Sequence, residues 1–500
     1  MIAKIEKIIK WFFWVPFVLA FIGYFWADGG AGCVNLSVVE ALYASAALYF
    51  VNPVADNANT WILTAEVLAI IVTTSVIISV VSALFGNLAH WWARRWKDST
   101  TVYSDTSWGE QLAATLKHGY LKSDSDLEDA EKTHDHIIMF SDDQKNLNFY
   151  EHNKEKMKDG RVFLALNQID SFLLNSSSDK NVHFFQVYDL IARKYWKENH
   201  LYEEIFHHKD GIGTGEKQTY KIAIIGYGNM GRSIFKYGFL NNIYDLNQKI
   251  EYHVWGADVV EREFLETLLF ENKDTVVVHK EDYKENMHLF AEMNRIIIAD
   301  GLKEEMTLSV LQNLLHENAQ LSIHCYNAGE DFTGFFQAPN LYTFGDATEI
   351  LTEDNIKNER LYRQAKLVNY DYCLRYANAF LPSDYEAKIE EEWNKLDGFK
   401  KGSNVARADF YWIERKRLDE GAEEETIWRM EHIRWCRYHY YNRWSYAKER
   451  DNANRKHHLL VPFDELPQSE KEKDGIYDDT LRKEIEELIT CLLYTSDAAD

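Results

Sequence analysis

Cysteine and basic residues are scarce in this 500-residue chain, and each shortage excludes a class of site. The cysteines lie far apart, and no CxxC pair occurs among Cys33, Cys325, Cys373, Cys436 and Cys491. This spacing fits a reducing compartment and predicts no zinc site. Lys and Arg total 55 against 79 Asp and Glu, so the formal net charge is −24. A broad nucleic-acid surface is therefore excluded, because phosphate binding needs clustered cations.

Basic residues are completely missing from Trp11 to Ala93, although Lys and Arg flank this region on both sides. Two apolar segments lie within it, Trp11 to Ala27 and Trp61 to Gly86. Each is long enough to cross a bilayer core of about 30 Å, and tryptophans lie near the segment ends. The flanking cations predict that both termini are cytoplasmic. The sequence thus predicts a membrane hairpin over residues 1–98, in contact with lipid in the inner membrane of a prokaryote.

A third apolar segment, Ser37 to Val51, lies between the two predicted spans and is interrupted by Glu40. It fits a re-entrant pore helix, an amphipathic helix at the outer surface or a packed helix. On the second span, Ser75, Ser79 and Ser82 share one weakly polar helix face. Such a face lines a pore or packs closely against another helix. Either use predicts a homo-oligomer, because two helices alone cannot enclose a pore.

Two sets of three short apolar runs recur farther along the chain with one spacing. The upstream runs start at His136, Arg161 and Asn181, and the downstream runs start at Arg295, Gln320 and Asn340. Both sets step by 25 and then by 20 residues. Apolar runs separated by helix-length stretches are typical of βαβ units in a parallel sheet. The repeat therefore predicts two tandem Rossmann-like domains.

The two copies differ before their triplets. The downstream copy opens with KIAIIGYG and has two further strand-like runs, EYHVWGAD and TVVVHKED. The upstream copy reaches its triplet from Thr100 in little more than thirty residues, so we expect it to lack its second and third strands. We assign a degenerate domain to residues 99–210 and a complete one to residues 219–356.

The stretch GYGNMG at the start of the complete copy has the pattern of a dinucleotide-binding loop. The first glycine allows the tight turn, the second lets the backbone approach a pyrophosphate, and the third lets helix and strand pack closely. The helix start then directs free N–H groups at the phosphates. Asp258 ends the next apolar run, where a ribose-binding carboxylate belongs, and Asp300 ends a later one; both also fit loop roles. The predicted cofactor is NAD(H) or another adenine nucleotide, held by Gly226, Tyr227, Gly228, Asn229, Met230, Gly231, Asp258 and Asp300.

Two membrane spans followed by tandem Rossmann domains resemble ligand-gated potassium channels with regulator-of-conductance (TrkA-type) domains. The resemblance implies a ring of subunits, a tetramer by analogy, that couples nucleotide binding to a pore. The filter signature TVGYG of that family is absent.

The segment beginning RMEHIRWCRYHYYNRWSYAKERD resembles the RyR domain, the repeat named from ryanodine receptors, over residues 421–490. It departs from the family at Arg443, where Gly is usual, and at Ala447 and Phe463. A helical linker over 357–420 would connect it to the second Rossmann domain. Guanidinium and aromatic groups suit an anionic planar ligand, although a structural aromatic core fits them too. The residues predicted to bind it are Glu431, Arg434, Trp435, Trp444 and Arg450.

The sequence thus predicts a membrane helical hairpin, two tandem α/β domains and a mostly α-helical RyR domain. The last ten residues, CLLYTSDAAD, resemble a translated sequencing adapter, so we interpret 491–500 as foreign. The leading interpretation is a nucleotide-sensing channel. The alternatives are a membrane-tethered NAD(P)-dependent oxidoreductase and a non-conducting membrane sensor or scaffold. No substrate domain and no Lys, His or Tyr constellation for hydride chemistry is apparent, so we predict neither an enzyme nor any catalytic or metal-ligating residue.

Overall fold

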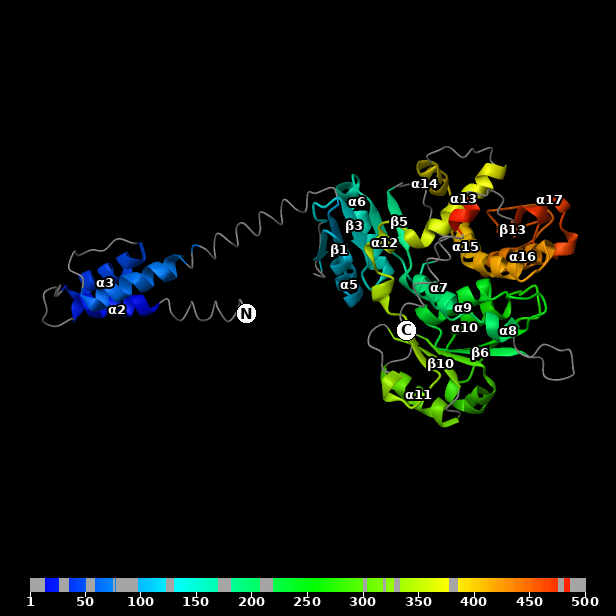
Figure 1. Cartoon of the computed structure of the whole chain (residues 1–500), viewed down its shortest axis with the longest axis horizontal. Coiled ribbons are helices and arrows are strands. Elements are labelled where there is room, and N and C mark those ends of the chain that lie inside the picture. The colour runs from blue at the N-terminus through cyan, green and yellow to red at the C-terminus, as the bar shows by residue number, and fades with distance from the viewer. Residues whose placement is uncertain are drawn as a thin grey trace. The chain divides into compact units, whose positions relative to one another are not determined.

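The structure is a computed structural model, and it divides the chain into two compact units, residues 1–96 and 97–500. The residues that it describes are 14–26, 36–50, 59–74, 77, 98–122, 130–169, 181–206, 219–299, 304–317, 321–327, 333–376, 385–474 and 481–485. Figure 1 shows the helices and strands of both units.

The first unit is a small helical cluster. Its described elements are α2 (Trp14–Phe25), α3 (Val38–Ala47), a 3-10 turn (Leu48–Phe50) and a helix over residues 60–74. The three helices share a core in which Tyr24, Ala44 and Ile62 are fully buried. Ser37 caps α3 in a capping box with Glu40, and the Ser37 backbone N–H donates to Glu40 Oε2 at 3.0 Å. The segment between the predicted spans is therefore a packed helix.

The predicted membrane hairpin is wrong. Within the described residues, no helix has both the length and the apolar character needed to cross a bilayer. α2 has 12 residues and at 1.5 Å per residue measures about 18 Å, short of the roughly 30 Å of a hydrocarbon core. The spans at 11–27 and 61–86 and the location in the inner membrane are corrected accordingly. Ser75, Ser79 and Ser82 lie outside the described residues.

The first α/β domain of the second unit is built on a parallel sheet in the order β2-β1-β3-β4-β5. Its strands are β1 (Thr100–Tyr103), β2 (Gly119–Lys122), β3 (Asp135–Ile138), β4 (Val162–Ala165) and β5 (Val182–Phe185). Its helices are α5 (Ser107–Thr115), α6 (Asp143–Met157), α7 (Val187–Glu198) and α8 (Tyr202–Phe206). We expected this domain to lack the second and third strands of the complete copy, and this expectation is wrong for one of the two strands. β2 pairs with β1 from Thr100–Gly119 to Tyr103–Lys122, but its residues are not fully buried, so it lacks the apolar run of a core strand.

The second α/β domain has a parallel sheet in the order β11-β10-β9-β6-β7-β8. Its strands are β6 (Tyr220–Ile225), β7 (Ile250–Trp255), β8 (Thr275–Val278), β9 (Arg295–Ile298), β10 (Ser322–Tyr326) and β11 (Leu341–Phe344). Its helices are α9 (Asn229–Asn241), α10 (Val259–Glu266), the 3-10 segment Tyr283–Glu292, α11 (Glu304–Glu317) and the short turn Thr333–Phe335. The order reverses between β6 and β9, as in a doubly wound Rossmann fold. Two tandem parallel-sheet domains are thereby confirmed.

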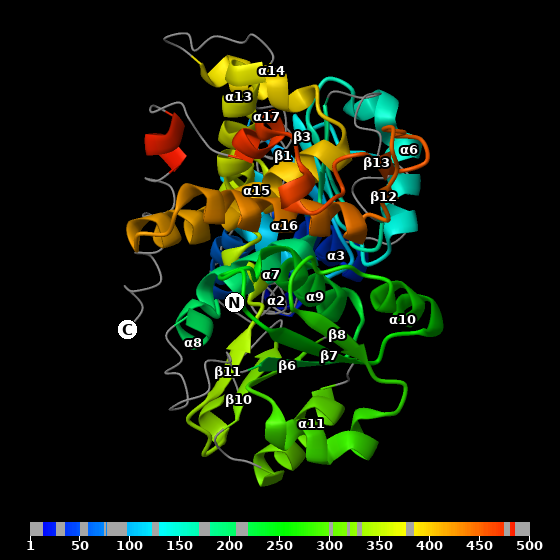
Figure 2. The same cartoon turned by 90° about the vertical axis from the view of Figure 1, so that its right-hand side faces the viewer.

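A helical region follows and packs on both α/β domains. It contains α13 (Arg363–Tyr376), α14 (Glu386–Asn394), α15 (Gly398–Asp419), α16 (Glu424–Tyr441), the strand pair β12 (Ser445–Tyr446) and β13 (Lys456–His457), α17 (Gln468–Lys471) and 3-10 turns at Phe463–Glu465 and Glu472–Asp474. α15 and α16 lie over α7 and α9 (Figure 2), and both contact α9. One buried core runs from Ile137 of the first sheet through Phe235 of α9 to Phe410 of α15.

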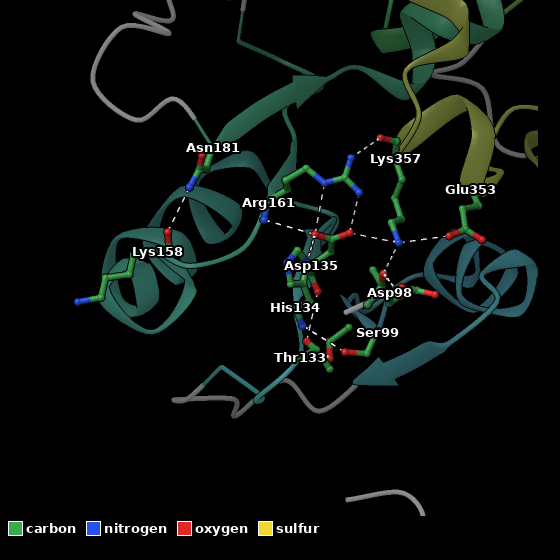
Figure 3. A network of polar contacts seen from close by, with 12 residues as sticks. Asp98, Ser99, Thr133, His134, Asp135, Lys158, Arg161, Asn181, Glu353 and Lys357 are labelled. Atoms are coloured by element: carbon green, nitrogen blue, oxygen red, sulfur yellow. Dashed lines mark hydrogen bonds and ion pairs between the residues drawn. The ribbon is translucent and has the colours of Figure 1, made fainter. Parts of the chain in front are cut away.

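The chain returns from β11 to the first domain before the helical region begins. The return segment holds the 3-10 turn Ala347–Glu349, α12 (Glu353–Ile356) and the 3-10 turn Arg360–Tyr362. Figure 3 shows Lys357 of this segment beside Asp135 of β3, and the Lys357 Nζ and Asp135 Oδ2 atoms are 3.2 Å apart. Lys357 Nζ also donates to Thr100 Oγ1 at 2.8 Å. Arg161 donates through Nη2 to Asp135 at 2.8 Å and through Nη1 to the Lys357 carbonyl at 3.0 Å. Asp135 is 1% exposed, so the sheet's amino edge is closed by a buried ionic network.

Candidate functional site

The glycine loop between β6 and α9 has the backbone geometry of a phosphate cradle. Gly226 adopts φ +91°, a left-handed conformation that favours glycine. A Cβ atom at Gly231 would lie 2.0 Å from the Gly226 carbonyl oxygen, so only glycine lets the helix start so close to the strand. Gly228 caps α9, whose first turn contains no acidic residue. The positive end of α9 therefore faces the carboxyl edge of the sheet without a carboxylate of its own.

Two of the side chains between these glycines pack into the hydrophobic core. Tyr227 and Met230 are buried, and the Tyr227 ring meets Phe235 edge-on at 6.2 Å between centroids. Burial raises the pKa of the Tyr227 hydroxyl well above its ordinary value. Asn229 is half-buried at the first position of α9. Asp300 lies outside the described residues.

Asp258 is the exposed N-cap of α10 at the same edge of the sheet. Its Oδ1 accepts from the Glu261 backbone N–H at 2.8 Å, and Glu261 Oε2 accepts from the Asp258 N–H at 2.9 Å. Glu261 also pairs with Arg232 of α9, so the starts of both helices are tied together. The cap uses one carboxylate oxygen of Asp258, and the other oxygen takes no part in the capping box.

Gly256 also lies at this site, although it is outside the GYGNMG stretch and was not predicted. It directly follows β7 with φ +91°, and a Cβ there would lie 3.2 Å from the Tyr227 backbone nitrogen. The position next to the glycine loop is thus kept free of any side chain. In the sequence, Gly256 could have been recognised as a glycine between the apolar run of β7 and the N-cap residue Asp258.

The second candidate site is a cavity of about 560 Å³ beside α16, which we call the RyR cavity. It is bounded by α13, α15, α16, the β12–β13 region and the turn Glu472–Asp474. This volume lies in the usual range for small-molecule sites. Of the predicted ligand-binding residues, Glu431, Arg434, Trp435 and Arg450 line it.

The lining of the RyR cavity is cationic, in contrast to the acidic chain as a whole. Three carboxylates face six cations, which are Arg375, Lys400, Arg407, Arg434, Arg450 and Lys473. The carboxylates belong to Asp371, Glu431 and Glu470. Asp397 and Glu414 lie outside this lining and pair with Lys400 and Arg407, so the net excess of positive charge is smaller, and it still favours an anion.

A buried ion-pair network forms the floor of the cavity. Arg434 donates through Nε to Glu431 Oε2 at 2.6 Å and through Nη2 to Glu431 Oε1 at 2.7 Å. The two side chains are 1% and 3% exposed. Arg407 pairs with both Glu431 and Glu414, and burial raises the pKa of the Glu414 carboxyl. Arg434 Nη1 is buried without a hydrogen-bond partner among the described residues, so one guanidinium donor is unused.

Trp435 supplies an aromatic wall flanked by neutral histidines. Its ring centroid lies 3.9 Å from that of His439 and 5.0 Å from that of His457. Burial lowers the pKa of His439 to about 3 and that of His457 to about 4. These rings are therefore uncharged near pH 7, and the positive charge comes from Arg and Lys.

The remaining predicted residues occupy different places. Trp444 is 8% exposed and stacks on Phe399 at 5.1 Å, in a small core with Cys436 and Leu460. Arg450 is exposed at the rim and donates to Asn452 Oδ1 at 2.8 Å. Arg375 and Arg407 could not be predicted from the sequence, because they come from α13 and α15, which precede the RyR resemblance.

α9 connects the two candidate sites. It begins at the glycine loop, and near its end the Phe239 carbonyl accepts from Arg437 Nη1 at 2.8 Å. Arg437 lies on α16, one turn after Arg434, and also binds Asp274 through Nη2 at 2.8 Å. The side chains of Arg437 and Asp274 are both 0% exposed. The second α/β domain and the RyR cavity thus share a buried junction.

Comparison with known proteins identifies the C-terminal region. Residues 422–495 match the model of the RyR domain, which confirms that resemblance; the match extends five residues into the segment interpreted as foreign. No curated protein matches the chain. A structure titled GsuK bound to ADP is 12% identical, with 72% of this chain and 98% of that chain covered and a TM-score of 0.35. The structure of the GsuK channel is also 12% identical, with 72% of this chain and 98% of that chain covered and a TM-score of 0.36. L-tryptophan dehydrogenase from Nostoc punctiforme is 11% identical, with 69% of this chain and 89% of that chain covered and a TM-score of 0.24. Likenesses this distant carry no conclusion about ligand, activity or assembly.

Proposed function

We propose that this chain is a nucleotide-sensing regulatory protein whose RyR cavity binds an anionic nucleotide. The observation that carries the proposal is the cationic lining, with six Lys or Arg side chains against three carboxylates. Phosphate groups are recognised by such clusters, above all through guanidinium groups. The unused Nη1 donor of Arg434 supplies a fixed contact at the floor of the cavity.

Trp435 accounts for selection of a nucleotide over a simple anion. Its partly buried ring lines the cavity together with Arg450. A purine ring stacks on an aromatic face, while its phosphates reach the guanidinium groups. The volume of about 560 Å³ accommodates both parts of such a ligand.

The glycine loop of the second α/β domain is the proposed site of NAD(H) or another adenine nucleotide. Gly226, Gly228 and Gly231 provide the turn and the close helix approach that a pyrophosphate needs. Because α9 leads from this loop to Arg437, binding at the loop biases the position of α16. The proposed activity is therefore a coupling free energy between two sites, and it requires no catalytic residue.

Isothermal titration of the full chain with ADP tests the proposal for the RyR cavity. ADP is expected to bind, and adenosine is expected to bind at least about tenfold more weakly because it lacks the charged phosphates. Arg450→Gln should weaken ADP binding by about fivefold without unfolding the protein, since Arg450 is exposed.

Arg360→Gln is the matched control, because Arg360 is a surface arginine that does not line the cavity. The control should bind ADP like the unmodified chain. Equal ADP affinities for the Arg450 and Arg360 variants, or equal affinities for ADP and adenosine, would overturn the proposal.

A further inference from the structure

Strand β8 forms the outer edge of the second sheet, and only one of its two sides is paired. The sheet order ends at β8. Its pairing with β7 is parallel and runs from Glu251 opposite Thr275 to Val254 opposite Val278. Within the ranges that the structure describes, no strand pairs with the other side of β8. Such an edge presents unpaired N–H and C=O groups, to which a strand of another chain can add.

The backbone groups at this open edge belong to Val276 and Val278. The His279 N–H donates to the Val254 carbonyl at 2.9 Å, so His279 directs its backbone groups toward β7. Because successive residues of a strand direct these groups to opposite sides, Val277 also bonds to β7. Val276 and Val278 therefore direct their N–H and C=O groups outward, and the described residues supply no partner for them. Each of these valines thus offers one donor and one acceptor to a second strand.

The side chains of β8 carry no charge, in contrast to edges that are protected against pairing. The strand has the sequence TVVV, and Val277 is 37% exposed. Val276 and Val278 lie on the opposite face of the sheet, where they pack against the hydrophobic core. The open edge is therefore apolar on the face that carries Val277.

A second copy of β8 fits this edge in antiparallel orientation about a two-fold axis. Hydrogen-bonded pairs form only between residues whose backbone groups face each other, so outward residues must lie opposite outward residues. The register that sets Val276 opposite Val278 of the second copy satisfies both valines of each chain. Val277 then lies on the axis, opposite Val277 of the second copy, in a non-hydrogen-bonded pair.

The charges that flank β8 are complementary in this register. Lys273 precedes the strand and Glu281 follows it; both are exposed, and neither has an ion-pair partner among the described residues. The register places Lys273 opposite Glu281 of the second copy, and the two-fold axis repeats this pair. A shift by two residues in either direction would place Lys273 opposite His279 or Tyr283 instead. Opposite charges across an antiparallel pair stabilise it, so the charge pattern favours the register centred on Val277.

Lys280, the exposed cation next to Glu281, does not oppose this pairing. In the same register it lies opposite Asp274 of the second copy, and Asn272 lies opposite Asp282. Like charges are therefore not brought together at the ends of the paired strands.

We propose that two copies of this chain pair through the open edges of β8, antiparallel and with Val277 on the two-fold axis. The 6-stranded sheets of the two copies then form one continuous sheet. Both copies use the same surface, as in other closed homodimers. No residue of β8 lines the RyR cavity, so the proposal does not depend on nucleotide binding there.

Disulfide trapping tests the register directly. The Cα atoms of a non-hydrogen-bonded antiparallel pair are about 4.5 Å apart, within the range that a disulfide spans. Oxidation of the full chain carrying Val277→Cys with copper phenanthroline should therefore give a covalent dimer, measured against the unmodified chain. Thr275→Cys is the matched control, because Thr275 is exposed on the same face but lies opposite His279 of the second copy. It should cross-link at least about tenfold less, since its two copies are too far apart for a disulfide.

Charge reversal gives a second test that leaves β8 itself unchanged. Lys273→Glu and Glu281→Lys should each weaken the dimer by about fivefold in sedimentation velocity. The double variant should recover the affinity of the unmodified chain, because the pair is restored with its charges exchanged. Lys448→Glu makes the same change of charge at an exposed position outside the second α/β domain, and it should have no effect.

The proposal is overturned by any of three results. The first is that Val277→Cys gives no covalent dimer, and the second is that Thr275→Cys cross-links equally well. The third is that the double charge variant associates no better than the two single variants.

Discussion

At the residue scale, Asp258 combines two roles that a sequence cannot separate. It is the N-cap of α10, and it is the first carboxylate beyond β7 at the edge that carries the glycine loop. Asn caps helices as well as Asp does, so Asp258→Asn should change the free energy of unfolding by less than about 0.5 kcal/mol. We expect the same variant to weaken NAD binding by about tenfold, because the second carboxylate oxygen no longer accepts from a ribose hydroxyl. Isothermal titration measures this loss.

Asp397→Asn is the matched control for this substitution. Asp397 caps α15 through a hydrogen bond from the Lys400 N–H at 2.8 Å, away from the glycine loop. It should bind NAD like the unmodified chain. If both Asp-to-Asn variants bind NAD equally well, Asp258 has only its capping role.

Arg443 explains a departure from the RyR family in terms of backbone conformation. It adopts φ +62°, in the left-handed region where the usual glycine is free of strain. Its guanidinium lies 4.3 Å from the centroid of the Phe264 ring, a cation–π contact with the second α/β domain. The contact offsets part of the conformational cost of this position.

We predict that Arg443→Gly will be more stable than Arg443→Ala by about 1 kcal/mol. Both variants lose the contact with Phe264, and only the alanine keeps the strained backbone conformation. Urea denaturation of the two variants gives this difference directly. Equal stability would mean that the backbone relaxes when the arginine is removed.

At the scale of elements, Arg437 fixes α16 to the second α/β domain. Its guanidinium binds the carbonyls of Phe239 and Phe270 as well as Asn272 and Asp274. Arg437→Met should lower the free energy of unfolding by about 3–5 kcal/mol, since it leaves the Asp274 carboxylate buried without its cation. Chemical denaturation measures the loss.

A double-mutant cycle distinguishes the ion pair from simple packing. Arg437→Met combined with Asp274→Asn should cost clearly less than the sum of the two single substitutions. Additive costs would show that the pair contributes nothing beyond the separate contacts of each residue.

Elements with strong local patterns were predictable from the sequence, and those without them were not. The two triplets of strands follow from apolar runs at matched spacing, and the glycine loop follows from the strand and helix around Gly226. β2 was missed because its partly exposed residues lack an apolar run. Only part of the lining of the RyR cavity could be predicted. Arg434 lies within the family resemblance, whereas Arg407 reaches the cavity only because α15 packs on α16.

The first unit shows why composition misled the prediction of membrane spans. A region without Lys or Arg satisfies the charge pattern of a hairpin, but spanning also requires one uninterrupted helix. α2 ends at Phe25 after 12 residues, and α3 begins at its own capping box. Glu40, interpreted as an interruption of an apolar segment, completes the capping box in the first turn of this helix.

At the scale of the whole second unit, the return segment joins parts of the chain that are far apart in sequence. Lys357 follows the second α/β domain and inserts its ammonium beside Asp135 at the amino edge of the first sheet. Burial alone would raise the pKa of Asp135, but the hydrogen bond and charge of Arg161, with His134 and Lys357, lower it to about 2. The ionised carboxylate therefore stabilises the contact between the two domains.

This network makes the free energy of unfolding depend on pH in the range where Asp135 is protonated. The folded pKa of about 2 lies below the ordinary value of about 3.9, so Asp135 contributes about 2 kcal/mol above pH 4 to 5, and the contribution is lost as the pH falls toward 2. Asp135→Asn should be several kcal/mol less stable at pH 6, because Arg161 and Lys357 lose their buried counter-charge. In urea denaturation, the difference in free energy of unfolding between this variant and the unmodified chain should narrow as the pH falls from 6 to 3.

Asp142→Asn is the control, because it replaces an exposed cap of α6. Its difference from the unmodified chain should stay constant over this range. A pH-independent gap for Asp135→Asn would show that its carboxylate does not carry the acid dependence.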